Sequence, residues 1–510
     1  MLVDASVLLL AVLVGPALIA LVAAAAGKHR PHAVGQAGAL VAGLGFLATC
    51  ILAIEAGRDH VASATLGGLA VSADSLATLL LMLVFGVSTV VQAFAVRYLA
   101  GDPRAAWFTA CASLVTAGSA GLVTATTLVG LAVGWTLAGI ALCLLLGMYW
   151  HLPAARDGVR RTATAFLVGD LALWTAVAMA TAQWGVIDLR ALDGQRLDGA
   201  VVPVIACLIV TAALSRSAQV PFHRWLPATL AAPTPVSALL HAGVVNAGGI
   251  LLVRLAPLAS SELARGLTIL AGVITLSYGA VIMLVKPDIK GALAHSTMAQ
   301  MGFMILTCGL GLWAAAVFHL VAHGFYKATL FLSSGSAIAR QRRAASRPPT
   351  ASMTRLRLVL TAGAAVALPA IALYAAVRAV SLPAGDHTAE QALLVFAWVT
   401  GAAATWGWLV RRRGLGATVT AAVVLLPVAL AYVGLVSAVG TFLAPALPAG
   451  TPPPQLTWLV IGATVAALAG LAVLRWARGS ALHRAVYARA LNAGHIAPSL
   501  PATRLTGARW

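Results

Sequence analysis

Long apolar runs recur along this chain from one end to the other, and they limit its fold more than any other feature. Each run is close to the ~20 residues that an α-helix needs to cross the hydrocarbon core of a bilayer. Of the 510 residues, 61% are hydrophobic and 9% are charged, which lies outside the usual range of soluble globular domains. Within lipid, only helices and closed barrels satisfy their backbone hydrogen bonds. The sequence therefore predicts an all-α polytopic membrane protein.

The runs predict about 14–15 transmembrane helices, given the ~20-residue length of a crossing. One span contains Pro221 and Pro227, and bilayers tolerate such breaks only where protein or a water-filled cavity satisfies the freed backbone. We expect a discontinuous helix there, as in ion-coupled carriers; a simple proline kink is the alternative. The predicted spans are 6–27, 34–56, 72–99, 105–124, 128–150, 162–183, 203–231, 234–255, 264–285, 292–311, 314–339, 358–380, 391–410, 415–445 and 456–475.

Polar residues divide the chain into five expected parts. Nearly all intramembrane polar side chains fall in residues 72–340, the expected functional core. Residues 1–71 are expected to form N-terminal helices, and a charged segment with Pro-Pro at 341–357 predicts a cytoplasmic linker. A plainer bundle of transmembrane helices follows at 358–475. The basic tail at 476–510 predicts either an amphipathic helix on the membrane surface or a solvated tail.

The basic residues are spread over short loops between the apolar runs. The chain has 33 Lys and Arg against 14 Asp and Glu, but it has no single basic domain that would indicate nucleic acid binding. If every predicted span crosses the bilayer, the basic loops share one face, and acidic loops with residues such as Asp188 and Glu262 share the other. The positive-inside rule then predicts an N-terminus outside the cell and a C-terminus in the cytoplasm.

Several kinds of site are not indicated by the sequence. The five cysteines all fall within apolar runs and form no CxxC pair, so we expect neither a disulfide framework nor a zinc site. The sequence has no GxGxxG fingerprint, P-loop or haem motif, and we expect no cofactor in this chain. The first span lacks a charged n-region and is too long for the h-region of a cleaved signal, so we interpret it as a helix.

The run VFHLVAHGFYKATL carries three ionisable residues inside a predicted span. His319, His323 and Lys327 are four residues apart, which places them on one face of a helix at successive turns. Ionisable groups are costly inside a bilayer and mark functional sites. A single histidine would more often be a satisfied core residue, but three groups in register indicate a proton path.

Four further ionisable residues lie in neighbouring spans. His241 follows the APTPVS break, His295 lies in ALAHSTMAQMGF, and Arg216 precedes Pro221. Asp170, in AFLVGDLALW, is the only carboxylate well inside its span and is a natural counter-ion for Arg216 or for the lysine of the proton path. An arginine guanidinium stays protonated in proteins, so we expect Arg216 to fix a charge and not to carry protons.

Three long motifs resemble one membrane-protein family. SRSAQVPFHRWLPATLAAPTPVSALLHAGVVNAGGILL, DIKGALAHSTMAQMGF and FHLVAHGFYKATLFLSSGS occur in that order and resemble the antiporter-like proton-channel subunits of respiratory complex I and of Mrp-type cation/proton antiporters. The resemblance covers roughly residues 70–340 and implies that residues 72–340 form an antiporter-like proton-translocating core. Within that superfamily, YLAGD at 98–102 and NAGG at 246–249 are similar to the DabB membrane subunit of the DAB inorganic-carbon pump, whose C-terminal half is also short.

The resemblance assigns roles to the ionisable residues. It implies that the stripe in VFHLVAHGFYKATL is the family's central proton relay, that His241 is the histidine after the broken helix, and that Asp170 is the acid of a VGD motif. Three positions depart from the family pattern. Arg216 replaces a lysine, Thr136 replaces a glutamate after the tryptophan at position 135, and Arg378 falls where the second broken helix has its terminal lysine.

The departures favour one of three functional interpretations. The first is a proton-conducting (or sodium-conducting) subunit of an inorganic-carbon pump in a bacterial cell membrane, working with a cytoplasmic zinc-containing DabA-type partner. The chain has no Cys/His/Asp constellation for zinc, so hydration of CO2 would belong to the partner. The second is a proton-pumping subunit of a complex I-like NADH-quinone oxidoreductase or an Mrp-type antiporter, which would be expected to keep the lysine–glutamate pair. The third is a scaffold without conduction. In each case the chain is expected to be no enzyme itself.

Overall fold

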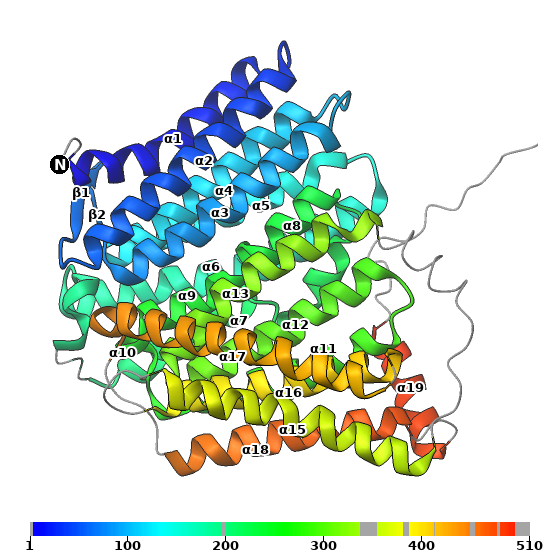
Figure 1. Cartoon of the computed structure of the whole chain (residues 1–510). Coiled ribbons are helices and arrows are strands. Elements are labelled where there is room, and N and C mark those ends of the chain that lie inside the picture. Colours follow the sequence, from blue (N-terminus) through cyan, green and yellow to red (C-terminus); the bar gives the residue numbers. More distant parts are fainter. Residues whose placement is uncertain are drawn as a thin grey trace, which may run out of the picture. The chain divides into compact units, whose positions relative to one another are not determined.

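The structure, a computed structural model, is built almost entirely of helices (Figure 1). Among the described residues, twelve helices are long and apolar enough to cross a membrane, which confirms a polytopic all-α membrane protein. The other three predicted spans correspond to α7 (Val202–Arg216), α12 (Ile289–Gly309) and α18 (Pro454–Trp476). The structure describes residues 4–194, 197, 199–336, 354–380, 387–412, 414–448, 454–476 and 480–494.

The chain forms two compact units. The first comprises residues 1–311, 319–334 and 448–510, and the second comprises residues 312–318 and 335–447. Besides α7, α12 and α18, the helices of the first unit are α1 (Ala5–Ala26), α2 (Pro31–Ala56), α3 (Ser75–Tyr98), α4 (Ala105–Thr124), α5 (Leu128–Leu146), α6 (Pro153–Trp184), α8 (Thr234–Ala242), α9 (Ala247–Arg254), α10 (Ala256–Ala259), α11 (Glu262–Val285), α19 (Ala481–Gly494) and most of α13 (Trp313–Leu332).

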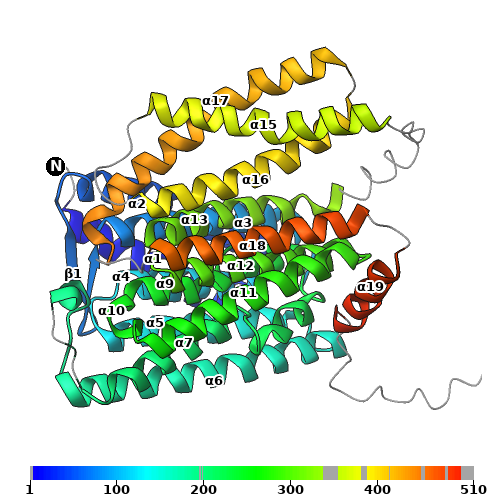
Figure 2. The same ribbon diagram turned by 90° about the horizontal axis from the view of Figure 1, so that it is seen from below.

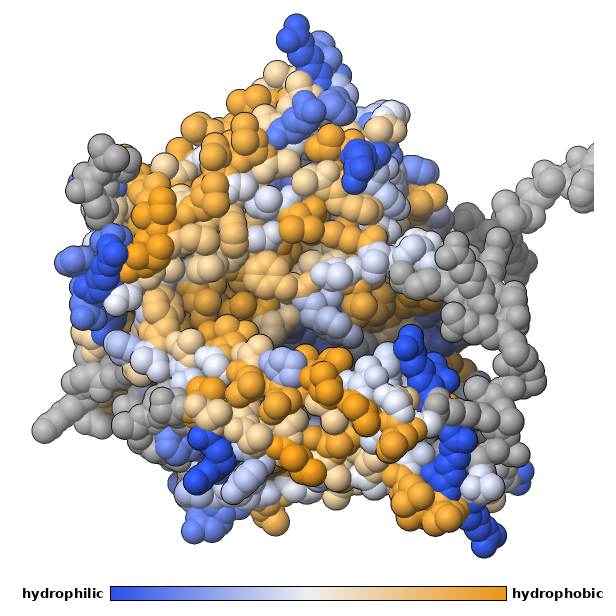
Figure 3. All heavy atoms as spheres, viewed as in Figure 1, coloured by the Kyte–Doolittle hydropathy of each residue, from blue (hydrophilic) through white to orange (hydrophobic). Residues whose placement is uncertain are grey.

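The outer helices present leucines where a soluble protein would present polar residues. Leu21 on α1, Leu40 on α2 and Leu171 on α6 are 68%, 62% and 60% exposed. Figure 3 shows hydrophobic atoms over the middle of the helices and hydrophilic atoms near their ends. This distribution suits a surface that contacts lipid chains along the helices and water or headgroups at the ends.

The predicted discontinuous helix is present. α7 ends at Arg216, and the chain continues through a non-helical stretch into the 3-10 helix η3 (Phe222–Thr229) before α8 begins. Nearby groups satisfy the backbone that the break exposes: Val220 N donates to Thr275 Oγ1 at 3.0 Å, and Trp225 Nε1 donates to Ser215 O at 2.9 Å. These hydrogen bonds reduce the free-energy cost of interrupting the helix, because they pair polar groups that the break would otherwise leave unsatisfied.

Close packing fixes α12 against α11. A Cβ atom at Gly302 would lie 2.4 Å from the backbone nitrogen of Leu276, and one at Gly279 would lie 2.5 Å from that of Ala299. Small residues at a helix crossing let the two backbones approach closely. This contact holds the face of α12 that carries His295.

Between α2 and α3 the chain forms a hairpin outside the helices. Strands β1 (Ala62–Leu66) and β2 (Leu69–Ala73) pair antiparallel. The turn residues Gly67 and Gly68 have φ angles of +56° and +80°, and two-residue hairpins favour glycine at such positions.

The second unit contains the plainer bundle. Its helices pack through Ala372, Ala376, Ala429 and Val433. Arg378 lies exposed in the last turn of α15. Of the predicted linker at 341–357, residues 341–353 lie outside the described residues. α15 begins at Arg355, within the last residues of that predicted segment. The helices are α15 (Arg355–Ala379), α16 (Thr388–Arg411) and α17 (Leu415–Leu443), followed by the 3-10 helix η5 (Ala444–Ala446).

The basic tail is helical in its described part. α19 contacts α11 in the first unit: Tyr278 Oη donates to Ala493 O at 2.8 Å, and Lys286 Nζ donates to Gly494 O at 2.6 Å (Figure 2). A lysine at a helix C-terminus also interacts favourably with the helix dipole. The predicted tail beyond residue 494 lies outside the described residues.

Candidate functional site: an ionisable stripe and a buried ion pair

The three ionisable residues of α13 lie on one helix face, as their spacing predicts. The ring centroids of His319 and His323 are 5.7 Å apart. His323 is 3% exposed and Lys327 is fully buried. Lys327 Nζ donates to Ser296 Oγ on α12 at 2.9 Å, so a hydroxyl group that can both donate and accept lies directly beside the ammonium.

His241 brings α8, which ends at Ala242 and is followed after Gly243 by a 3-10 turn, into contact with this stripe. The Nε2 atom of His323 lies 3.1 Å from the carbonyl oxygen of His241. The ring of His241 stacks on Phe331 of α13 with a centroid distance of 4.3 Å. Together the two contacts join the end of α8, just before the Gly243 break, to two turns of α13.

Buried ring nitrogens along the stripe have no protein partner. His241 Nδ1, His323 Nδ1 and His319 Nε2 are buried, and in the described part of the chain none of them has a hydrogen bond. Leaving a buried polar atom unpaired costs about 1–3 kcal/mol, whereas internal water satisfies such atoms. The stripe therefore suits water molecules between its ionisable groups.

His295 belongs to a second row that ends near the α11–α12 turn. His295 Nδ1 lies 2.8 Å from Gly291 O on its own helix. Its ring centroid is 6.4 Å from that of Tyr278, which in turn packs edge-on against His223 at 4.9 Å. His223 and Tyr278 are not among the site residues predicted from the sequence. His223 stands inside the PFHRW motif, which was a usable signal, but nothing in the sequence pointed to Tyr278.

Arg216 and Asp170 form an ion pair in which the arginine is fully buried and the side chain of Asp170 is 17% exposed. Arg216 Nη2 lies 2.7 Å from Asp170 Oδ1, which also accepts a hydrogen bond from Trp135 Nε1 at 2.7 Å. Arg216 Nη1 donates to Trp135 O at 3.1 Å. The guanidinium lies 4.3 Å from the Trp135 ring centroid and 4.1 Å from that of Phe166. Of the two predicted partners of Asp170, Arg216 is therefore the observed one, and Lys327 binds Ser296 instead.

The neighbouring Thr136 does not replace the missing acid. Its Oγ1 accepts a hydrogen bond from Trp174 Nε1 at 3.1 Å at the outer surface of the helices. The negative charge beside Arg216 comes from α6, through Asp170, and not from α5.

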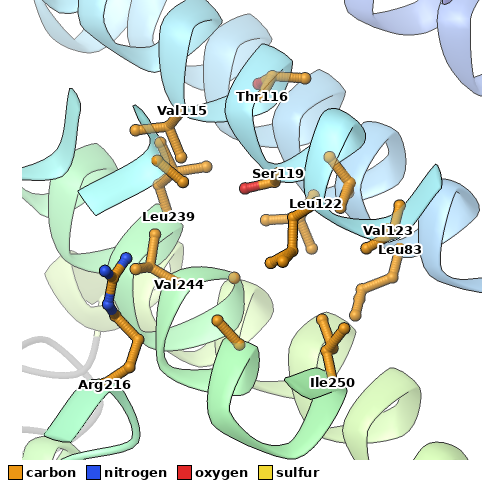
Figure 4. Close-up of a pocket in the computed structure, with 15 residues that line it drawn as sticks. Leu83, Val115, Thr116, Ser119, Leu122, Val123, Arg216, Leu239, Val244 and Ile250 are labelled. Atoms are coloured by element: carbon orange, nitrogen blue, oxygen red, sulfur yellow. The ribbon is translucent and has the colours of Figure 1, made fainter. Parts of the chain in front are cut away.

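A small cavity of about 40 Å³ lies beside Arg216. Most of its wall is apolar, formed by Val, Leu, Ala and Gly residues of α3, α4, α5, α8, η4 (Val244–Asn246) and α9. Figure 4 shows Ser119 of α4 and Arg216 of α7 on two sides of it, with the Ser119 hydroxyl directed inward. At 10–15 Å³ per water position, such a volume holds roughly three water molecules.

The chain matches two family models. Residues 125–411 match the model described as NADH:quinone oxidoreductase/Mrp antiporter, TM, and residues 68–109 match that of the N-terminus of NADH-ubiquinone oxidoreductase (complex I) chain 5. The probable inorganic carbon transporter subunit DabB1 of Halothiobacillus neapolitanus is 35% identical over 408 residues, which cover 75% of this chain and 72% of that protein.

Other relatives match over shorter stretches. The DabB subunit of Bacillus subtilis is 39% identical over 276 residues, covering 52% of this chain and 54% of that protein. NADH-quinone oxidoreductase subunit L of Mycobacterium tuberculosis is 36% identical over 327 residues, covering 60% and 51%, so the chain spans about half the length of these two relatives. A solved structure of the Mrp complex from Dietzia sp. has a TM-score of 0.63 and 25% identity, covering 95% of this chain and 59% of that one. The resemblance drawn from the motifs is confirmed.

Proposed function

Because the chain belongs to the NADH:quinone oxidoreductase/Mrp antiporter family of membrane subunits, with DabB subunits among its relatives, we propose that it is the proton-conducting membrane subunit of an inorganic carbon transporter. The observation that carries this proposal is the buried row His319, His323 and Lys327 on α13, with Ser296 and His241 against it. A buried lysine beside a hydroxyl group and histidines supplies groups that can bind and release protons in turn.

The hydrogen bond of His323 fixes how its ring takes part. A carbonyl oxygen only accepts, so Nε2 of His323 must carry the hydrogen that it shares with His241 O. In the neutral ring, Nδ1 is then an acceptor, and among the described residues it has no partner. Nδ1 of His323 can therefore accept a proton from a neighbouring water molecule, including one on the side of Lys327.

The ion pair has a different role in this proposal. Arg216 stays charged, and Asp170 and the two aromatic rings hold it in place. A fixed charge biases the protonation of neighbouring groups without exchanging protons itself. Of the two buried cations, Lys327 is therefore the one that exchanges its proton, and Arg378, also an arginine, is proposed as a second fixed charge of the pathway.

Conduction through the stripe is tested by proton flux in proteoliposomes. We expect Lys327→Ala to lower the flux at least about 100-fold, in the range of lost proton-transfer groups. Lys28→Ala is the matched control, because Lys28 is exposed in the α1–α2 turn, and it should conduct as the wild type does. Equal flux in wild type and Lys327→Ala would contradict the proton relay and support the interpretation of the chain as a scaffold.

The coupling to inorganic carbon rests on the relatives named DabB. In the described part of the chain, no group of three or more His, Cys, Asp or Glu side chains could hold a metal ion, so we propose that CO2 hydration belongs to a zinc-containing DabA-type partner at the cytoplasmic face of a bacterial cell membrane. The tagged chain should co-purify with such a partner, and the pair should rescue growth in air of a carbonic-anhydrase-deficient host. Failure of both would remove the carbon assignment, whatever the flux result.

The second candidate is a subunit of a complex I-like oxidoreductase or an Mrp-type antiporter. The similarity to subunit L and to the solved Mrp complex favours it, while the threonine at position 136 and the arginine at position 216 count against it. Sodium-dependent proton flux by the reconstituted chain, without any carbon phenotype, would favour the antiporter.

A further inference from the structure

Buried polar side chains form a ladder between α3 and α4, away from the ionisable stripe. Gln92 Nε2 donates to Ser88 Oγ at 2.9 Å, and the hydroxyl oxygens of Ser88 and Thr116 are 2.7 Å apart. Ser113 Oγ lies 3.5 Å from Gln92 Oε1. All four side chains are at most 4% exposed. We call these four residues the hydroxyl ladder.

The ladder follows one face of α4. Thr109, Ser113 and Thr116 are spaced by four and three residues, which places their hydroxyls on one side of the helix. Thr109 is also buried and lies in the first turns of α4, close to the α3–α4 turn. The row therefore leads from one end of the helix pair toward its middle.

The inner end of the ladder opens into the cavity beside Arg216. Thr116 is both a member of the ladder and part of the cavity wall, and Ser119 lies one turn further along α4 (Figure 4). Arg216 forms part of the wall, and its Nε is buried without a partner among the described residues. Two hydroxyls and one unpaired N–H give the cavity the polar partners that water needs.

α8 contacts both this cavity and the stripe on α13. Leu239 and Gly243 line the cavity, and between them in α8 stands His241, whose carbonyl accepts from His323. The cavity thus lies between the inner end of the ladder, at Thr116, and the helix whose His241 contacts the stripe.

We propose that the hydroxyl ladder and Ser119 form a second water-lined proton branch, which leads from the α3–α4 turn into the cavity beside Arg216 and toward His241. Each hydroxyl accepts a proton on its oxygen while its own proton passes to the next water or hydroxyl, so no group changes its net charge after a transfer. At Thr116 this proton leaves the hydrogen bond that the hydroxyl donates to Ala112 O at 2.9 Å.

Gln92 cannot relay protons in this way and acts as a positioning residue for Ser88, so in this proposal a water molecule carries the proton from Ser113 past Gln92 to Ser88. The inference rests on the proposed proton conduction.

An interhelical hydrogen-bond network without transport would have the same geometry, and hydroxyl-specific variants separate the two. Thr116→Val keeps the side-chain volume and removes the hydroxyl. We expect it to lower proton flux in proteoliposomes at least about tenfold, which corresponds to about 1.4 kcal/mol in the barrier. Thr116→Ser, which restores the hydroxyl, should recover most of the flux.

Ser119→Val tests the cavity without disturbing the network. Among the described residues Ser119 makes no hydrogen bond with the ladder, so the added methyl groups displace water and leave the α3–α4 contacts in place. We expect a similar loss of flux. This variant also decides the matter if Thr116→Val does not fold.

Thr89→Val is the matched control. Thr89 is the neighbour of Ser88 on α3, and its hydroxyl donates only within its own helix, to Phe85 O at 2.6 Å. It should conduct as the wild type does. Wild-type flux in Ser119→Val, or equal losses in Thr89→Val and Thr116→Val, would overturn the branch. Lys327→Ala is measured under the same conditions. Its loss of flux shows whether the stripe on α13 conducts protons even if the branch does not.

Discussion

Lys327 and Arg216 are both buried cations, but their surroundings give them different chemistry. Two hydrogen bonds and two aromatic faces hold the guanidinium of Arg216, and one of those bonds is an ion pair with Asp170. The ammonium of Lys327 has one hydrogen bond, to a serine. Arginine stays charged in proteins, whereas lysine can release its proton when buried. The site therefore combines one fixed charge with one exchangeable charge.

The ion pair makes a prediction about stability. Asp170→Asn keeps the shape of the side chain but leaves the charge of Arg216 buried without compensation, so we expect a loss of about 3–5 kcal/mol in the free energy of unfolding. Thermal or denaturant unfolding in detergent measures it.

Asp59→Asn serves as the control for this change. Asp59 is exposed and has a φ of 62°, a conformation that asparagine also adopts, so its stability should be unchanged. If Asp170→Asn were as stable as the control, the pair would contribute nothing to the fold.

At the scale of helices, the close crossing of α11 and α12 sets the position of the residues on α12. A Cβ at Gly302 would also lie 2.8 Å from Gly272 O. The backbone of α11 is therefore too close to accept a side chain at this position. His295 and Ser296 are carried on this helix, and Ser296 holds Lys327. The helix crossing and the proton path are therefore linked through one element.

Gly302→Ala tests this link. The added methyl group should force the helices apart and cost about 1–3 kcal/mol in stability, and the displacement of Ser296 relative to Lys327 should lower proton flux as well. Gly266→Ala is the control in α11, since a Cβ there meets nothing within 4 Å. It should be neutral or slightly stabilising, because alanine favours a helix by about 1 kcal/mol over glycine. A Gly302→Ala protein with unchanged stability and flux would contradict the argument.

Features that belong to a single helix were predictable from the sequence. Hydropathy and length predicted a span at 105–124, and α4 runs from Ala105 to Thr124; the four-residue spacing predicted the shared face of the α13 stripe. Both are local properties of one helix. The contact between Lys327 and Ser296 and the meeting of α3 and α4 in the hydroxyl ladder join distant segments, and they depend on how helices pack. The sequence shows the hydroxyls of α4 at helical spacing, but it does not show what faces them.

For the whole molecule, the open question is which ends of the helices face the cytoplasm. Within the first unit, contacts group the turns by end: Arg104 Nη1 of the α3–α4 turn donates to Met148 O after α5 at 3.1 Å. At the opposite end, Thr126 Oγ1 donates to Ala70 O of the β hairpin at 3.1 Å. Alternate turns thus share an end, as the grouping of basic loops requires. The excess of Lys and Arg in the α1–α2, α3–α4 and α11–α12 turns predicts that their end is cytoplasmic.

Reporter insertions can test this orientation at two turns of the first unit. The Gly67–Gly68 turn has open space around both residues, so a small epitope inserted there should leave the helices in place. We expect it to be accessible from outside intact cells, whereas an epitope at Lys28 in the α1–α2 turn should be accessible only after permeabilisation. The two sites lie at opposite ends of α2, so each is the other's control. Labelling in the reverse order would place the basic turns outside, while equal labelling at both would mean that α2 does not cross the membrane.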